Sequence, residues 1–390
     1  MKKFALMGNI VLPDRVLEGG VVIVEGERIA GVFPKDQSPP SRGVVRHDYG
    51  GCSITPGLID LHLHGAMGKD VMDGSTGSLA EIAAHQARCG VTGFVPTTLA
   101  ASLASMKNAV DGIRAAMKHR TGAEILGVYL EAPFLSLKKK GAQNPEFIRP
   151  IDPETVKAIL EFCGGLKTII TVAPEVGENL SFVPALKEKG WVVSIGHSEA
   201  TYEQAIVSFE KGITHATHLY NAMSGFLPRE PGVIGAVLDS PGITAEIIAD
   251  GIHVHPAAQR LALRQKGVDR ICLITDSVNA SGLGDGDFRV GGLDVVVKGG
   301  EARLKDSGAL AGSVLTLNRS VKNIIQWTGL SVPQGVRMAS LTPARVLGLD
   351  REMGSIEVGK LASLAVFDRD FDVVDTYIRG RSPRYHPSSP

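Results

Sequence analysis

The stretch IDLHLHG, residues Ile59 to Gly65, places two histidines at the end of an otherwise apolar run. Side chains at positions i and i+2 of a β-strand lie on the same face of that strand. His62 and His64 are therefore expected side by side, where the strand ends at Gly65. Such a pair is either a fortuitous surface pair or half of a metal site, and the rest of the chain has to decide.

The composition is that of an ordinary globular protein. The 390 residues are 44% hydrophobic and 21% charged, which is enough for a large core. The 41 basic and 41 acidic residues balance, so neither a nucleic-acid nor an anionic-membrane partner is expected. The four cysteines (Cys52, Cys89, Cys163 and Cys272) form no CxxC pair, which is typical of reduced thiols in a cytoplasm.

The first residues, MKKFALMGNIVLPDR, superficially resemble a secretory signal. The apolar part breaks at Pro13 and no small-residue cleavage site follows, so a β-strand is expected instead. No run approaches the ~18 apolar residues of a membrane span. We expect a cytoplasmic protein without a membrane partner.

The middle of the chain alternates strand-like and helix-like segments. The apolar runs begin at residues 56, 90, 124, 167, 191, 212, 243 and 270. Helix-like segments, such as 78–90, 152–165 and 201–212, lie between most of them, and Ser78 with Glu81 predicts a capping box at the first. This pattern predicts a parallel (β/α)8 barrel of the TIM type over residues 56–354.

The two ends of the chain have a different texture, with short β runs separated by Gly and Asp. Residues 1–55 and 355–390 are expected to meet in one small β-sandwich domain. Residues 284–304 predict an inserted β-hairpin after the last barrel strand.

Polar residues follow the predicted strands, where barrel enzymes carry their chemistry. In chain order they are His62, His64, Glu131, His197, His218, His253 and Asp276. Imidazole and carboxylate are ligands that Zn²⁺ and other first-row metals favour. This set predicts a hydrolytic metal site.

Each of these residues also has a purely structural interpretation, because a lone histidine at a strand end is usually just hydrogen-bonded. The two acids are harder to explain in that way. Glu131 follows ILGVYL and Asp276 follows ICLIT, so both would be buried, and an unpaired buried carboxylate costs several kcal/mol. Their coincidence with the histidines favours the metal site.

Eight short motifs in this order resemble the amidohydrolase superfamily and, within it, the N-acetylglucosamine-6-phosphate deacetylase family. The resemblance runs nearly from end to end. The motifs are HLH (62–64), LEAP (130–133), GHSEA (196–200), THLYNAM (217–223), REPG (229–232), DGIHV (250–254), TDSV (275–278) and LAGS (310–313).

The resemblance implies a metal-dependent hydrolase that releases acetate from an amino-sugar phosphate. It assigns Glu131, His197 and His218 to a principal divalent ion. His62 and His64 make a second ion possible, shared through Glu131 and Asp276. Whether one or two ions bind stays open, and so does their identity, with zinc expected first and iron or another ion as alternatives. The fourth strand run, TIITVAPE, lacks the lysine that bridges two metals in ring-opening relatives.

The resemblance also implies the remaining roles. Asp276 takes a proton from the attacking water and returns one to the departing amine. The expected substrate-binding residues are Gln143, Asn221, Ala222, Arg229, His253, Leu310 and Ala311. In the family the arginine that corresponds to Arg229 reaches across a dimer interface, so a homodimer is implied.

Two positions depart from the family pattern: Gln143 stands for a histidine, and Ala132 for a glycine. Glutamine still donates a hydrogen bond but cannot become cationic. Two alternatives therefore stay open. The first is a deacylase for a related substrate, such as N-acetylgalactosamine 6-phosphate or another N-acyl amine. The second is a non-catalytic scaffold that keeps the barrel.

Overall fold

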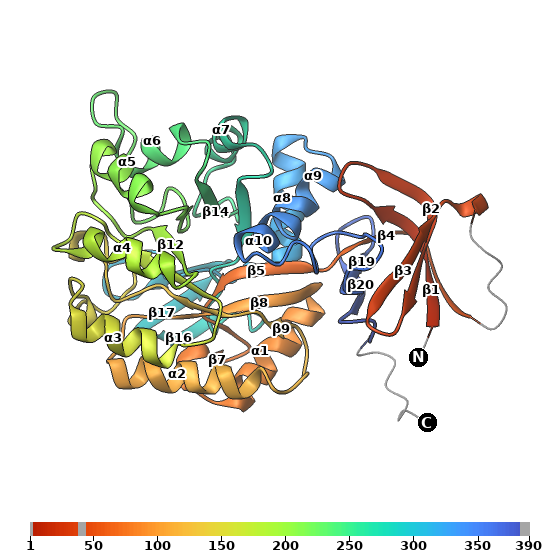
Figure 1. Cartoon of the computed structure of the whole chain (residues 1–390), viewed down its shortest axis with the longest axis horizontal. Helices are drawn as coiled ribbons and strands as arrows, with labels where there is room; N and C mark the ends of the chain where they lie inside the picture. Colours follow the sequence, from red (N-terminus) through yellow and green to blue (C-terminus); the bar gives the residue numbers. More distant parts are fainter. Residues whose placement is uncertain (1–2, 38–43, 383–390) are drawn as a thin grey trace.

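The computed structural model describes residues 3–37 and 44–382, and the rest of the predicted terminal segments lie outside these ranges. Its larger part is a barrel of eight parallel strands (Figure 1). They are β5 (Leu58–Leu63), β8 (Val91–Thr98), β10 (Val128–Leu130), β11 (Thr168–Val172), β12 (Val192–Ile195), β13 (His215–Ala216), β14 (Thr244–Ile248) and β15 (Ile271–Ile274). The predicted barrel is confirmed, and each strand falls within one of the eight apolar runs. The run from residue 124 also contributes the short β9 (Glu124–Ile125) beside β8.

A helix follows each barrel strand. These helices are α1 (Thr76–Arg88), α2 (Leu103–Ala116), α3 (Pro153–Phe162), α4 (Asn179–Glu188), α5 (Tyr202–Lys211), α6 (Gly232–Asp239), α7 (Pro256–Lys266) and α8 (Leu317–Thr328). Two more, α9 (Val332–Met338) and α10 (Leu341–Val346), lead back toward the small sheet. The predicted cap of α1 is wrong: Ser75 has the extended backbone of an N-cap and accepts from the Ser78 N–H, so the helix begins one turn earlier.

The barrel closes where its first and last strands meet, at the HLH motif itself. The Asp276 N–H donates to the His62 carbonyl at 2.9 Å, and Leu63 forms a parallel bridge to Ser277. Asp60, fully buried in β5, accepts the Thr275 hydroxyl at 2.6 Å and the Thr275 N–H at 3.2 Å. A side chain thus reinforces the seam where backbone pairing is sparse.

The smaller part is a six-stranded mixed sheet built from both ends of the chain (Figure 1). Its order is β20 (Val373–Tyr377), β19 (Leu364–Phe367), β4 (Val45–Pro56), β1 (Lys3–Val11), β2 (Val16–Glu25) and β3 (Arg28–Phe33). Leu6, Val22 and Ile29 share one buried apolar cluster with Leu364 and Val366. Residues from both ends of the chain therefore form a common core on this sheet. The predicted division at residues 55 and 355 stays a prediction.

The predicted hairpin is three antiparallel strands: β16 (Gly286–Val290), β17 (Leu293–Lys298) and β18 (Glu301–Leu304). A Gly-Gly pair makes each turn, at 291–292 and 299–300, and all four glycines have positive φ. The remaining short elements are β6 (Gly65–Ala66), β7 (Lys69–Asp70) and the 3-10 turns η1 (Lys35–Gln37), η2 (Val71–Asp73), η3 (Leu137–Lys139) and η4 (Pro145–Phe147). All four cysteines are free, and within the described ranges no helix has the length and apolarity to cross a membrane.

Replacing Asp60 with alanine should weaken the seam. The Thr275 hydroxyl and N–H would lose their acceptor inside the core, so we expect unfolding to become about 3 kcal/mol easier. Chemical denaturation would measure this loss. Asp294→Ala, at an exposed position of β17, is the matched control and should change stability by less than about 0.5 kcal/mol.

Candidate metal centre

Six of the predicted site residues meet at the carboxyl ends of the barrel strands. His62 is in β5 and His64 directly follows it, while the others follow their strands by one or two residues. Their metal-binding atoms form two groups, each within 4.8 Å: Glu131 with His197 and His218, and Asp276 with His62 and His64. All six residues are buried.

The Glu131 carboxylate lies between the two groups. Its Oε1 is 3.1 Å from His197 Nε2 and 3.0 Å from His218 Nε2, and these two nitrogens are 3.0 Å apart. The same carboxylate lies 3.5 Å from His62 Nε2 and 3.3 Å from His64 Nε2. Asp276 Oδ1 completes the second group, at 3.1 Å from His64 Nε2. Glu131 therefore lies within 3.5 Å of histidines from both groups.

The hydrogen-bond partners of the histidines show that this cluster suits a cation. His62 Nδ1 lies 3.0 Å from Glu246 Oε2, and His64 Nδ1 and His197 Nδ1 lie 3.1 Å and 2.7 Å from backbone carbonyls. These acceptors place the ring hydrogen on Nδ1, so each Nε2 presents a lone pair to the carboxylates. His62 Nε2 is buried, and no residue among 3–37 and 44–382 donates a hydrogen bond to it. Lone pairs facing one another in the core need positive charge between them, which either a metal ion or protons on the imidazoles would supply.

The pKa shifts of the two acids also agree with a cation site. Burial raises the pKa of Glu131, but His62, His197 and His218 outweigh it and hold the pKa well below the usual range. Burial likewise opposes ionisation of Asp276, whereas His62 and His64 lower its pKa. Both acids are therefore carboxylates, the form that binds metals.

The backbone at this site is unusual. His197, His218 and Asp276 have φ of 47°, 29° and 50°, in the left-handed region that non-glycine residues rarely adopt. Strained residues of this kind persist where the surrounding structure holds them, often at functional sites. The sharp turns aim these side chains back over the barrel mouth. Ala132 has no positive φ, so alanine fits where the family has glycine.

A cavity of about 300 Å³ opens above the cluster. Its lining includes Glu131, His64, His197, His218 and Asp276, together with the predicted substrate residues Gln143, Asn221, Ala222, His253, Leu310 and Ala311. Arg229 is not part of this lining: it lies on the exposed loop before α6.

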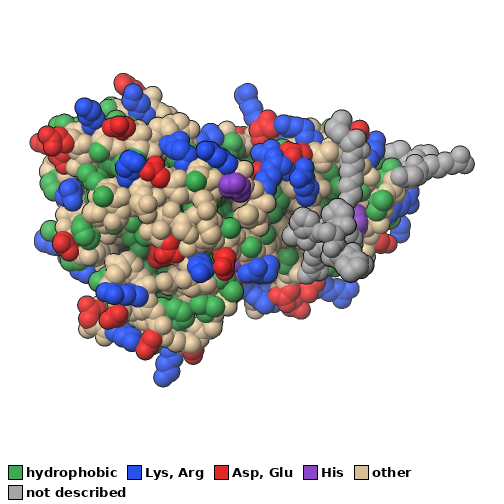
Figure 2. Space-filling view, turned by 90° about the horizontal axis from the view of Figure 1, so that it is seen from below, with side chains coloured by type: hydrophobic (Ala, Val, Ile, Leu, Met, Phe, Trp, Pro, Cys, Tyr) green, Lys and Arg blue, Asp and Glu red, His purple; other side chains and the backbone are tan. Residues whose placement is uncertain are grey.

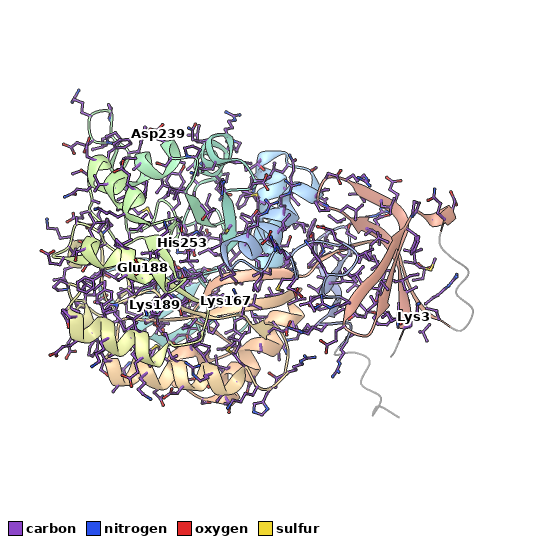
Figure 3. All side chains as sticks on the ribbon, in the orientation of Figure 1. Lys3, Lys167, Glu188, Lys189, Asp239 and His253 are labelled. Carbon is purple, nitrogen blue, oxygen red and sulfur yellow. The ribbon has the colours of Figure 1, made fainter. Side chains whose placement is uncertain are left out.

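His253 lines the cavity from the loop after β14 and is labelled near the middle of the barrel region in Figure 3. Its Nδ1 lies 2.6 Å from Asp250 Oδ2, and the same carboxylate accepts the His253 N–H. Asp250 thus fixes the ring and leaves Nε2 available to a ligand. The small sheet, where Figure 3 labels Lys3, lies at the other end of the molecule.

The sequence reasoning named Gln143 only as a substrate residue and missed its contact with Glu131, and it missed two further supporting acids. Gln143 is buried, its Nε2 donates to Glu131 Oε2 at 2.5 Å, and its Oε1 accepts the Ala100 N–H at 2.7 Å. It therefore orients Glu131 besides lining the cavity. Glu246 and Asp60 were also missed, although each is an acid inside an apolar strand, a signal visible in the sequence.

The profile of the amidohydrolase family matches residues 53–382, which is most of the chain. The chain belongs to the amidohydrolase family. This is a metal-dependent family, in agreement with the two groups of possible ligands.

Individual relatives within this family are named as deacetylases of amino-sugar phosphates. The N-acetylglucosamine-6-phosphate deacetylase of Bacillus subtilis (strain 168) is 38% identical, over 95% of this chain and 94% of its own. The N-acetylgalactosamine-6-phosphate deacetylase of Escherichia coli O157:H7 is also 38% identical, over 84% of this chain and 87% of its own. Among solved structures, N-acetylglucosamine-6-phosphate deacetylase from Pasteurella multocida is 36% identical, with a TM-score of 0.92 over 97% of this chain and 99% of its own.

Replacing Glu131 with alanine should remove bound metal from both groups, because this carboxylate is shared between them. Elemental analysis of the purified variant should show at least about tenfold less divalent metal than the wild type. Glu175→Ala is the control, since Glu175 follows the next strand but contacts Ser198 and Glu199 rather than the cluster. Wild-type metal content in Glu131→Ala would contradict the assignment.

Proposed function

We propose that this protein hydrolyses the acetamide of N-acetyl-D-glucosamine 6-phosphate to D-glucosamine 6-phosphate and acetate. The observation that carries the proposal is the pair of buried ligand groups joined by Glu131 beneath a cavity large enough for a sugar phosphate. The curated relatives named for this reaction support the choice of substrate.

A divalent metal, when bound, supplies a water nucleophile at neutral pH and polarises the amide carbonyl. Asp276 holds and moves the protons. Its carboxylate lines the cavity and is ionised, so it can accept a proton from the attacking water. It then donates that proton to the nitrogen of the departing amine, which leaves as the free amino sugar.

Gln143 and His253 orient the substrate in this proposal. Gln143 borders the carbonyl end of the cavity through its contact with Glu131. His253 presents Nε2 to the sugar or its phosphate because Asp250 occupies Nδ1. Asn221 and Ala222, with Leu310 and Ala311 from the opposite loop, complete the walls.

Arg229 would bind the phosphate of a substrate held by a second copy of the chain. Its guanidinium suits phosphate oxygens, yet it lies outside the cavity of its own protomer. Phe226 and Leu227, on the same loop, are 65% and 55% exposed. Two large apolar side chains exposed next to each other are typical of a surface that binds another protein chain. These observations support a homodimer.

We further propose a cytoplasmic protein whose metal is zinc, with iron or another divalent ion as alternatives. Imidazole and carboxylate ligands suit several of these ions, so availability in the cell decides between them. Figure 2 shows acidic and basic side chains interspersed over the visible face, in keeping with a zero formal charge and a small-molecule partner.

Acetate release from a panel of N-acetyl hexosamines, with and without the 6-phosphate, tests the substrate. We expect N-acetylglucosamine 6-phosphate to have the highest kcat/KM. A higher value for N-acetylgalactosamine 6-phosphate would favour the alternative epimer, which one relative's name also suggests. Protein that carries metal but releases acetate from none of them would support the scaffold alternative.

Asp276→Asn should lower kcat by about 10²–10⁴-fold, because the amide cannot accept the proton of the attacking water. KM should change by less than about threefold, since the change leaves the cavity shape intact. Steady-state kinetics would measure both. Asp250→Asn, which alters the support of His253, should instead raise KM more than it lowers kcat.

Arg229→Ala should lower kcat/KM for the phosphorylated sugar by about 10–100-fold and leave the weak turnover of the unphosphorylated sugar unchanged. Arg264→Ala, at an exposed position of α7, is the matched control. If the wild type turns over both sugars equally well, the phosphate assignment is wrong.

A further inference from the structure

Glu246 is a fully buried carboxylate inside β14, one layer below the ligand cluster. Its Oε2 accepts from His62 Nδ1 at 3.0 Å and from the His218 N–H at 3.0 Å. Its Oε1 accepts from His215 Nε2 at 3.1 Å. One side chain outside the ligand set thus contacts a histidine of each group.

We infer that Glu246 is a positioning residue, which holds His62 in the tautomer that binds a metal ion and so controls occupancy of the group formed by His62, His64 and Asp276. This inference rests on the proposed metal-dependent function. It concerns a residue that would touch neither the metal nor the substrate.

The partner of His62 differs in kind from the partners of the neighbouring histidines. His64 and His197 face the neutral backbone carbonyls of Thr97 and Lys139. His62 instead faces a carboxylate, which makes its imidazole a stronger base at Nε2 and hence a stronger ligand. On the other side of the His62 ring, Nε2 lies 3.5 Å from Glu131 and from Asp276, farther than the 3.0 Å between Nδ1 and Glu246.

The charges of the barrel interior lead to the same conclusion. Glu131, Asp276 and Glu246 are three carboxylates, and histidines that bind metals are neutral. A single divalent ion leaves negative charge in a region closed to solvent. A second ion compensates it, so the Glu246 charge favours binding at the group that contains His62.

The position of Glu246 is itself fixed from the far side. His215, also fully buried, lies between Glu246 and the Thr244 hydroxyl, with its Nδ1 at 2.6 Å from Thr244 Oγ1. The carboxylate is therefore held between two imidazoles and cannot turn away from His62.

The test compares zinc binding by the wild type, Glu246→Gln and Glu124→Gln. Glutamine keeps an acceptor for His62 but removes the charge. In competition with a chelator, Glu246→Gln should hold its weaker zinc ion about 10–100-fold less tightly. Glu124→Gln, which alters a carboxylate paired with Arg379 away from the cluster, should stay within about twofold of the wild type.

Equal zinc binding by the wild type and Glu246→Gln would overturn the inference alone, and so would an equal loss in Glu124→Gln. A wild type that binds no divalent metal would overturn the proposed function as well. A second measurement needs no folded variant: ¹⁵N NMR of the zinc-loaded wild type should show the His62 hydrogen on Nδ1. A hydrogen on Nε2 would refute the inference.

Discussion

The site depends on one constraint: four imidazole nitrogens and two carboxylates point at one another in the buried mouth of the barrel. Lone pairs repel, and no hydrogen-bond donor separates His62 Nε2 from the acids. Such an arrangement is unfavourable unless a metal ion or protons on the imidazoles neutralise it. The outer partners of three rings, two backbone carbonyls and Glu246, favour hydrogen on Nδ1 and so direct Nε2 of His62, His64 and His197 to the centre.

The barrel turns this constraint into a usable centre. Its strands end at the same level, so residues separated by more than 200 positions in the chain become neighbours, and the left-handed backbone at His197, His218 and Asp276 directs their side chains inward. The supporting carboxylates Asp60 and Glu246 lie deeper, within strands β5 and β14. Substrate residues lie on the loops above, where variation between relatives is tolerated.

Much of the fold could be predicted from the sequence, because a parallel barrel strand is a continuous apolar run and each run ended in a polar residue. The candidate ligands could be predicted from burial. Glu131 and Asp276 follow apolar strands, where an unpaired carboxylate is unfavourable, so each was expected to have a positively charged partner. Details that depend on neighbours in space were out of reach. The contact between Gln143 and Glu131 joins two loops, and the cap of α1 at Ser75 rather than Ser78 depends on local backbone geometry. The third strand of the inserted sheet, β18, could have been predicted from the sequence, because the Gly-Gly turn signal occurs twice.

The meeting of the first and last barrel strands has a consequence for synthesis. His62 leaves the ribosome early, but its neighbour Asp276 and the strand that closes the seam emerge more than 200 residues later. The small sheet has the same property, since β4 pairs with β19 from the other end of the chain. A nascent or truncated chain therefore lacks the group of His62, His64 and Asp276 until the last barrel strand has been made, whereas Glu131, His197 and His218 are all present earlier.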